Sequence, residues 1–167
     1  MVTKFYVEGP FKMPTTKGKV ASTIAPSNIK EFWQRYPHVM KARGCYVFAM
    51  RAGKGFTPYY VGMATKTFKQ EIFAPQKLTK YQQALADYHK GTPVMFLVVS
   101  PKKISKGSST HIGQLEDFLI QVALTANADL LNIKGTKQAQ WSIAGILRSG
   151  QGKASESAKG LKRTLKM

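Results

Sequence analysis

The sequence has little cysteine and little acidic charge, and each shortage disfavours a class of site. Cys45 is the single cysteine, so the chain holds no internal disulfide and no zinc site built from cysteines. Asp and Glu together number 8, against 26 Lys and Arg. Because a two-metal site needs several bridging carboxylates, this composition disfavours one.

Long apolar runs are also missing. The longest strongly apolar stretch, 94–99, is far too short to cross a bilayer, and the first eleven residues lack the apolar centre of a signal peptide. We therefore expect a cytoplasmic protein without a membrane partner. The sequence also lacks a GxSxG elbow, a P-loop and the glycine pattern of dinucleotide-binding folds.

Basic charge is what the sequence has in excess. The formal net charge is +18 on 167 residues, and hydrophobic residues make up 43%, enough for one buried core. A phosphate backbone is the usual partner of such a surface, because each neutralised phosphate releases counterions. Two alternatives are a solvated surface that keeps the protein soluble and, less favoured, an anionic membrane.

Alternation of apolar and turn-forming residues predicts an α/β (α+β) protein. Three core strands are expected at 44–50, 59–65 and 93–100, the first two joined by a long hairpin loop. Weaker strands are expected at 4–7 and 19–24. Helices are predicted at 28–36, 66–73, 81–89 and 110–127. Residues 1–43 would form an N-terminal extension packing on the core at 44–135, and residues 136–167 a basic, partly flexible C-terminal extension.

Glu116 stands out on the helix predicted at 110–127. At about 100° per residue it falls within the apolar arc that holds Ile112, Ile120 and Ala123. A carboxylate at the edge of a core face is costly unless it binds a cation. The pattern leaves two interpretations open. Glu116 forms an ion pair with a neighbouring Lys or Arg, or it binds one Mg²⁺ that keeps most of its water.

Four short motifs, in this order along the chain, resemble those of the GIY-YIG nuclease family. The motifs are Gly44-Cys45-Tyr46, Tyr60-Val61-Gly62, Gln114-Leu115-Glu116 and Leu130-Leu131-Asn132. The resemblance implies a small three-stranded antiparallel sheet flanked by helices, which hydrolyses DNA with a single Mg²⁺ or Mn²⁺. By the same resemblance Tyr46 and Tyr60 would lie near the attacking water, Glu116 would bind the metal, and Gly44, Gly62 and Asn132 would be structural.

The sequence departs from the family at one position. The family carries an Arg on the helix after the second motif, and the segment here, KTFKQEIF, has none. Lys69 is the nearest substitute, with Lys66 and Lys77 as further DNA contacts, but a Lys is a point charge where Arg holds two oxygens. The alternative function is therefore a nucleic-acid-binding protein that no longer cleaves.

Two further predictions concern partners. Trp141 is expected in the core, whereas Arg148 and the lysines of the tail are expected to contact backbone phosphates without choosing sequence. The composition does not exclude RNA, so an RNA-associated or ribosome-associated basic protein is a third possibility.

Overall fold

The computed structural model describes residues 3–88, 91–101, 108–132, 143–146 and 152–167. Contacts divide the chain into two compact units, Met1–Gly135 and Thr136–Met167. Trp141 and Arg148 lie outside the described residues. The lysines of the tail belong to the second unit, and the other residues selected from the sequence belong to the first.

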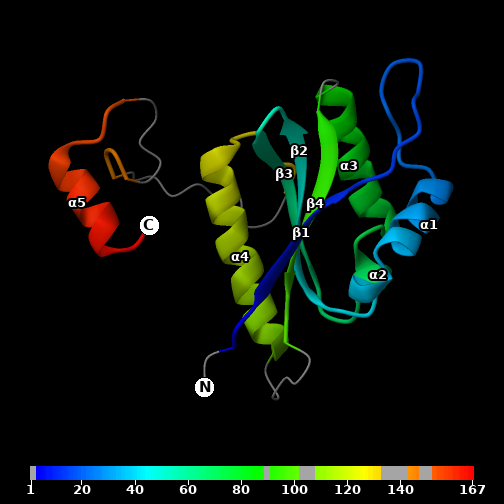
Figure 1. Ribbon diagram of the computed structural model, residues 1–167, viewed down its shortest axis with the longest axis horizontal. Coiled ribbons are helices and arrows are strands. Elements are labelled where there is room, and N and C mark those ends of the chain that lie inside the picture. Colours follow the sequence, from blue (N-terminus) through cyan, green and yellow to red (C-terminus); the bar gives the residue numbers. More distant parts are fainter. Residues whose placement is uncertain (1–2, 89–90, 102–107, 133–142, 147–151) are drawn as a thin grey trace. The chain divides into compact units, whose positions relative to one another are not determined.

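A four-stranded antiparallel sheet forms the centre of the first unit, which confirms the mixed α+β class (Figure 1). The strands are β1 (Tyr6–Lys12), β2 (Gly44–Ala52), β3 (Gly55–Ala64) and β4 (Thr92–Val99), in the order β1-β4-β2-β3. The expected count of three strands is wrong, because β1 adds to the free edge of β4, with Tyr6 opposite Val99. The stretch 19–24 is no strand and contributes only a bridge between Thr23 and Thr16.

The central hairpin is tighter than the sequence predicted. Strand β2 continues to Ala52 and β3 begins at Gly55, so two residues make the turn in place of a long loop. Glycine and proline near the turn suggested loop, but an edge strand tolerates Pro58 because its missing N–H need not pair. Both faces of β2 are buried except at its last two residues, as predicted, because helices cover both sides of the sheet.

The helices of the first unit begin and end at different residues from those predicted. They are α1 (Pro26–Arg35), the 3₁₀ turn η1 (Pro37–Val39), α2 (Phe68–Glu71), α3 (Pro75–Asp87) and α4 (Ser108–Ala126). Pro75 was read as the end of a helix, yet it starts α3, since proline fits the first helical turn, whose N–H groups need no helical partner. This start brings Lys77 into the first turn of α3.

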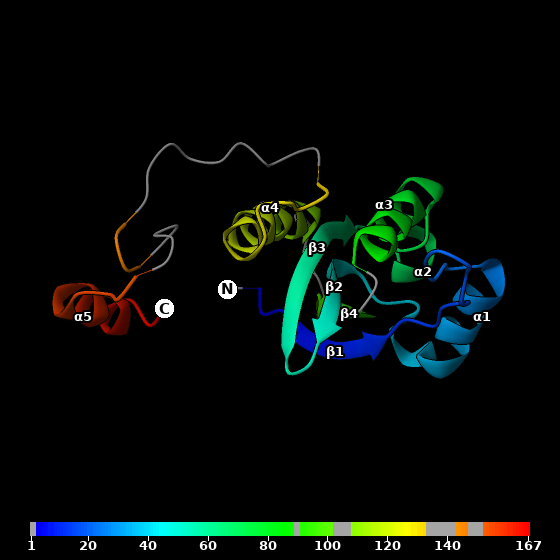
Figure 2. The same cartoon turned by 90° about the horizontal axis from the view of Figure 1, so that it is seen from above.

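The two faces of the sheet have separate cores (Figures 1 and 2). Helices α1, α2 and α3 cover one face, called the aromatic face here, with Tyr46, Phe48 and Tyr81 fully buried. Helix α4 covers the other, the α4 face. Its smaller cluster consists of Val61, Ile120, Ala123, Leu124 and Leu130.

Helix α4 does not bury its whole predicted apolar arc. Ile112, Ile120 and Ala123 are buried, but Phe118 is 62% exposed and Val122 is 46% exposed. The predicted arc spans more of the helix circumference than a sheet of this width covers, because α4 packs mainly on the edge strand β3.

The second unit contains helix α5 (Glu156–Thr164), where the sequence analysis predicted no helix. The Ser155 hydroxyl accepts a hydrogen bond from the Ala158 N–H at 3.1 Å, and Glu156 and Lys159 pair across one turn at 2.6 Å. An N-cap serine and an acid in the first turn are ordinary helix-start signals, which the basic composition of the tail obscured.

Candidate functional site

The hairpin of β2 and β3 brings the two motif tyrosines together. Tyr46 lies opposite Gly62, and Phe48 lies opposite Tyr60. Tyr46 and Tyr60 therefore occupy diagonal positions on the aromatic face, and their ring centroids are 6.4 Å apart. The sequence predicted the hairpin that joins the two motifs, and the family resemblance implied that both tyrosines lie near the attacking water.

The two motif glycines are required by packing. A Cβ on Gly62 would lie 2.4 Å from both Cζ and the hydroxyl oxygen of Tyr46, so glycine here makes room for the phenol ring. Gly44 has φ +144°, and a Cβ on it would lie 2.0 Å from the carbonyl oxygen of Val98 on β4. Any side chain at either position would push a strand or the tyrosine out of place.

Tyr46 is buried on the aromatic face of the sheet. Its side chain has no exposed area, and its hydroxyl has no partner with hydrogen-bond geometry among the described residues, although the Tyr81 hydroxyl lies close enough to lower the pKa of Tyr46 slightly. Burial, and then the neighbouring Tyr60, raise the pKa of Tyr46 well above its usual value of 10. A general base needs the opposite shift, so Tyr46 is unsuited to accept a proton from water.

Tyr60 is half-buried and has a cation beside it. The Lys77 amine donates a hydrogen bond to the Tyr60 hydroxyl at 3.0 Å and lies 5.3 Å from the centre of its ring. The sequence analysis selected Lys69 for this place. Lys69 is exposed on α2 and makes no side-chain hydrogen bond to the described residues.

Glu116 lies one helical turn after the point where α4 is fixed to β2. The Cys45 thiol donates a hydrogen bond to the carbonyl oxygen of Ile112 at 3.3 Å, and Ile112 and Glu116 are four residues apart on one helix face. Burial, and then the charge of Glu116, raise the pKa of Cys45 to about 12. The same charge also contributes to the raised pKa of Tyr46, so the half-buried carboxylate lies within electrostatic reach of the start of β2.

Asn132 holds the edge of β3 beside the tyrosines. Its side-chain oxygen accepts from the Val61 N–H at 2.9 Å, and its side-chain N–H donates to the Val61 carbonyl at 2.7 Å. The Leu131 N–H also donates to the carbonyl of Tyr59 at 2.8 Å. The segment after α4 therefore fixes the backbone on both sides of Tyr60.

The donor set for a metal is small. No group of three or more His, Cys, Asp or Glu side chains that could hold an ion exists among the described residues. One carboxylate, Glu116, fits only an ion that keeps most of its water shell, as Mg²⁺ does. It does not fit zinc, which takes at least three protein ligands.

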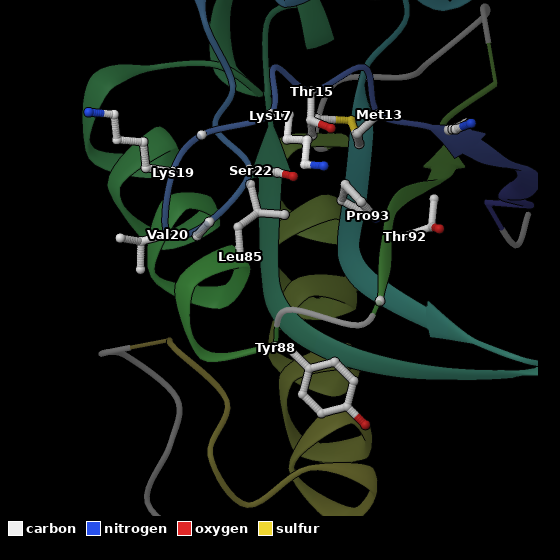
Figure 3. A pocket seen from close by; sticks show the side chains of 14 residues that line it. Met13, Thr15, Lys17, Lys19, Val20, Ser22, Leu85, Tyr88, Thr92 and Pro93 are labelled. Atoms are coloured by element: carbon white, nitrogen blue, oxygen red, sulfur yellow. The ribbon is translucent and has the colours of Figure 1, made fainter.

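Basic side chains also line two cavities that the sequence did not reveal. Lys66 lies in a cavity of about 640 Å³ together with Lys41 and Arg43. A second cavity, of about 410 Å³, is lined by Lys12, Lys17 and Lys19 among others (Figure 3). In Figure 3 Lys19 extends away from the other labelled side chains, and Tyr88 lies at the opposite end of the group.

Within the described part of the chain, none of the helices combines the length and apolar character needed to cross a bilayer. No protein-family model, no curated protein and no solved structure matches this chain.

Proposed function

We propose that this protein binds DNA and hydrolyses its phosphodiester bonds in the manner of the GIY-YIG nucleases, using Tyr60 and Lys77, which lie together on the aromatic face, and Glu116 of α4, which lies within electrostatic reach of Tyr46. The observation that carries the proposal is the 3.0 Å contact between the Lys77 amine and the hydroxyl of the half-buried Tyr60. Two motifs that resemble the family meet at this point on one hairpin, in a protein of net charge +18.

The chemistry needs positive charge where the phosphoryl oxygens become more negative. Lys77 supplies a fixed cation in place of the family's Arg, and its amine keeps the Tyr60 hydroxyl oriented. Tyr60 orients the attacking water through its hydroxyl, while the ring of buried Tyr46 packs near that of Tyr60. A Mg²⁺ or Mn²⁺ ion held by Glu116 and water would polarise the phosphate.

Cleavage of supercoiled plasmid in Mg²⁺ tests the proposal. Lys77→Gln should lower the rate about 100-fold or more, because one charge aimed at the transition state is lost. Glu116→Gln should lower it similarly, whereas the neighbouring variant Asp117→Asn should cleave like wild type. Lys69→Gln serves as the control for Lys77. Equal rates for Lys77→Gln and Lys69→Gln would remove Lys77 from the site.

A second candidate function is binding without cleavage, in the same fold. The buried Tyr46 and the small donor set favour it, because both leave little machinery for catalysis. This function would be established instead if the affinity of the wild-type protein for DNA falls steeply as salt rises, yet the protein cuts DNA with neither Mg²⁺ nor Mn²⁺. RNA that displaces the DNA at equal phosphate concentration would identify RNA as the partner.

A further inference from the structure

The cavity that contains Lys66 lies away from the tyrosines, at the end of the sheet where β2 begins and β4 ends. Its walls include η1, the segment 41–43, Lys66, and the residues Val99–Pro101 that close β4. At about 640 Å³ it is larger than the cavity beside Lys17, at about 410 Å³. A cavity of that size admits a phosphate with its attached sugars.

The charge in this cavity is mostly positive and uncompensated. Lys41, Arg43 and Lys66 line it, and their side chains form no ion pair or hydrogen bond with any other residue that the structure describes. One carboxylate, Glu8, also lines it, and that carboxylate is already paired with His38 at 3.2 Å. Three cations thus face one acid that has its own partner.

Ser100 adds an unpaired hydroxyl to the same wall. The residue is only 6% exposed, and its side-chain oxygen has no hydrogen-bond partner among the described residues. A buried hydroxyl without a partner is costly and calls for an explanation. An anion in the cavity would supply the missing acceptor while meeting the three cations.

Backbone hydrogen bonds join the segments that carry these side chains. The Ser100 N–H donates to the carbonyl of Arg43 at 2.8 Å. The Phe68 N–H donates to the carbonyl of Ala42 at 2.8 Å, and the Lys69 N–H donates to that of Met40 at 3.1 Å. The segments that carry Lys41, Arg43, Lys66 and Ser100 are therefore tied together before any ligand arrives, which lowers the entropic cost of binding.

We propose that this cavity binds one phosphate group of a nucleic-acid backbone, with Arg43 and Lys66 as its cations and the Ser100 hydroxyl as a hydrogen-bond donor. Lys41 contributes at the rim. The inference rests on the nucleic-acid binding of the proposed function but is independent of cleavage. Arg43 supplies the planar donor pair that matches phosphate oxygens, which Lys does not.

The decisive variant is Ser100→Ala, because it leaves the net charge unchanged. It removes a hydroxyl that has no partner among the described residues, so thermal unfolding should show no loss of stability. Its affinity for a DNA oligonucleotide should fall about tenfold, the effect of one hydrogen bond to a charged group. Undiminished oligonucleotide affinity in Ser100→Ala would overturn the proposed donor and, with it, the site.

The cations are tested by a double variant, Arg43→Gln with Lys66→Gln. The slope of log affinity against log salt should become shallower by about 1, the value for one lost phosphate contact. The matched control is Lys30→Gln with Lys54→Gln, which removes two charges at exposed positions that line none of the described cavities. Equal slopes for both double variants would contradict the site.

Titration with inorganic phosphate tests whether the cavity binds a phosphate of the nucleic-acid backbone or a free anion. With inorganic phosphate alone, amide signals of Ser100 and Arg43 should shift, and Ser100→Ala should reduce the shifts. If phosphate shifts these signals while both binding variants keep full oligonucleotide affinity, the site serves a free anion and the backbone assignment is overturned. If the wild-type protein binds no oligonucleotide, the proposed function is wrong, whatever the cavity binds. If inorganic phosphate also leaves the amide signals of Ser100 and Arg43 unshifted, the proposed phosphate site is wrong too.

Discussion

On the aromatic face of the sheet Phe48 stacks on Tyr81 with ring centroids 4.5 Å apart, and Tyr60 meets Tyr81 edge-on at 6.1 Å. The α4 face holds instead a few aliphatic side chains, which α4 places mainly against β3. Large rings fill the space between the sheet and several helices, whereas one helix on an edge strand needs only small side chains. The two motif tyrosines lie on the first of these faces.

The largest expected difference between the faces comes from a matched pair of leucine truncations. Leu97 lies in the middle of the sheet on the aromatic face and is fully buried, and Leu124 is 8% exposed on the α4 face. Leu97→Ala should cost about 4 kcal/mol and Leu124→Ala about 2 kcal/mol, because the edge site can collapse and the central one cannot. Urea unfolding measures both, and equal losses would show that the faces are packed alike.

A smaller difference should appear at high pH, on the α4 face. The folded protein keeps the Cys45 proton up to about pH 12, while the unfolded thiol releases it near pH 9. Between these two pH values the native state binds more protons than the unfolded state. The contribution of Cys45 to the free energy of unfolding is therefore fully present below pH 9 and is lost as pH rises toward 12. The loss should approach about 1.4 kcal/mol per pH unit.

Cys45→Ala isolates this contribution from the buried tyrosines, whose raised pKa values act in the same direction at higher pH. Urea midpoints at pH 7.5, 9 and 10.5 should fall less steeply in Cys45→Ala than in wild type. Parallel curves for the two proteins would show that the thiol is not protected by burial.

The smallest expected effect distinguishes two phenols within the aromatic face. The Tyr81 hydroxyl donates to the carbonyl of Ile72 at 2.8 Å, so Tyr81→Phe should cost about 1 kcal/mol. Tyr46 has no such partner among the described residues, so Tyr46→Phe should leave stability unchanged or raise it by up to about 1 kcal/mol. A loss in Tyr46→Phe as large as that in Tyr81→Phe would mean that the Tyr46 hydroxyl is satisfied in solution.

Several features of the site follow from local sequence. Apolar, β-rich runs between turn formers predict β2, β3 and β4 and the hairpin that joins the two motifs. The apolar period of α4 predicts that Glu116 sits at the edge of a buried face, and it is half-buried. These predictions succeed because the spacing along a strand or helix fixes which side chains share a face.

Other features depend on contacts between distant segments. The stretch at 4–7 is too short to identify β1 as a fourth strand, and its pairing with β4 depends on an edge more than eighty residues away. Lys77 could not be chosen over Lys69 without the start of α3 at Pro75 and its packing beside Tyr60. The cavity of Arg43, Lys66 and Ser100 has no sequence signature, since its walls come from four separate segments.

The amino-acid sequence by itself determined the mixed class of the fold, the hairpin that joins the two motifs, and the excess of positive charge. Those properties are local or additive, so composition and spacing carry them. Tertiary structure alone decided that Tyr46 is buried while Tyr60 is half-exposed beside Lys77. The physical reason is that exposure, pKa and the partner of a side chain depend on which distant elements pack over it, and no pattern along one segment contains that information.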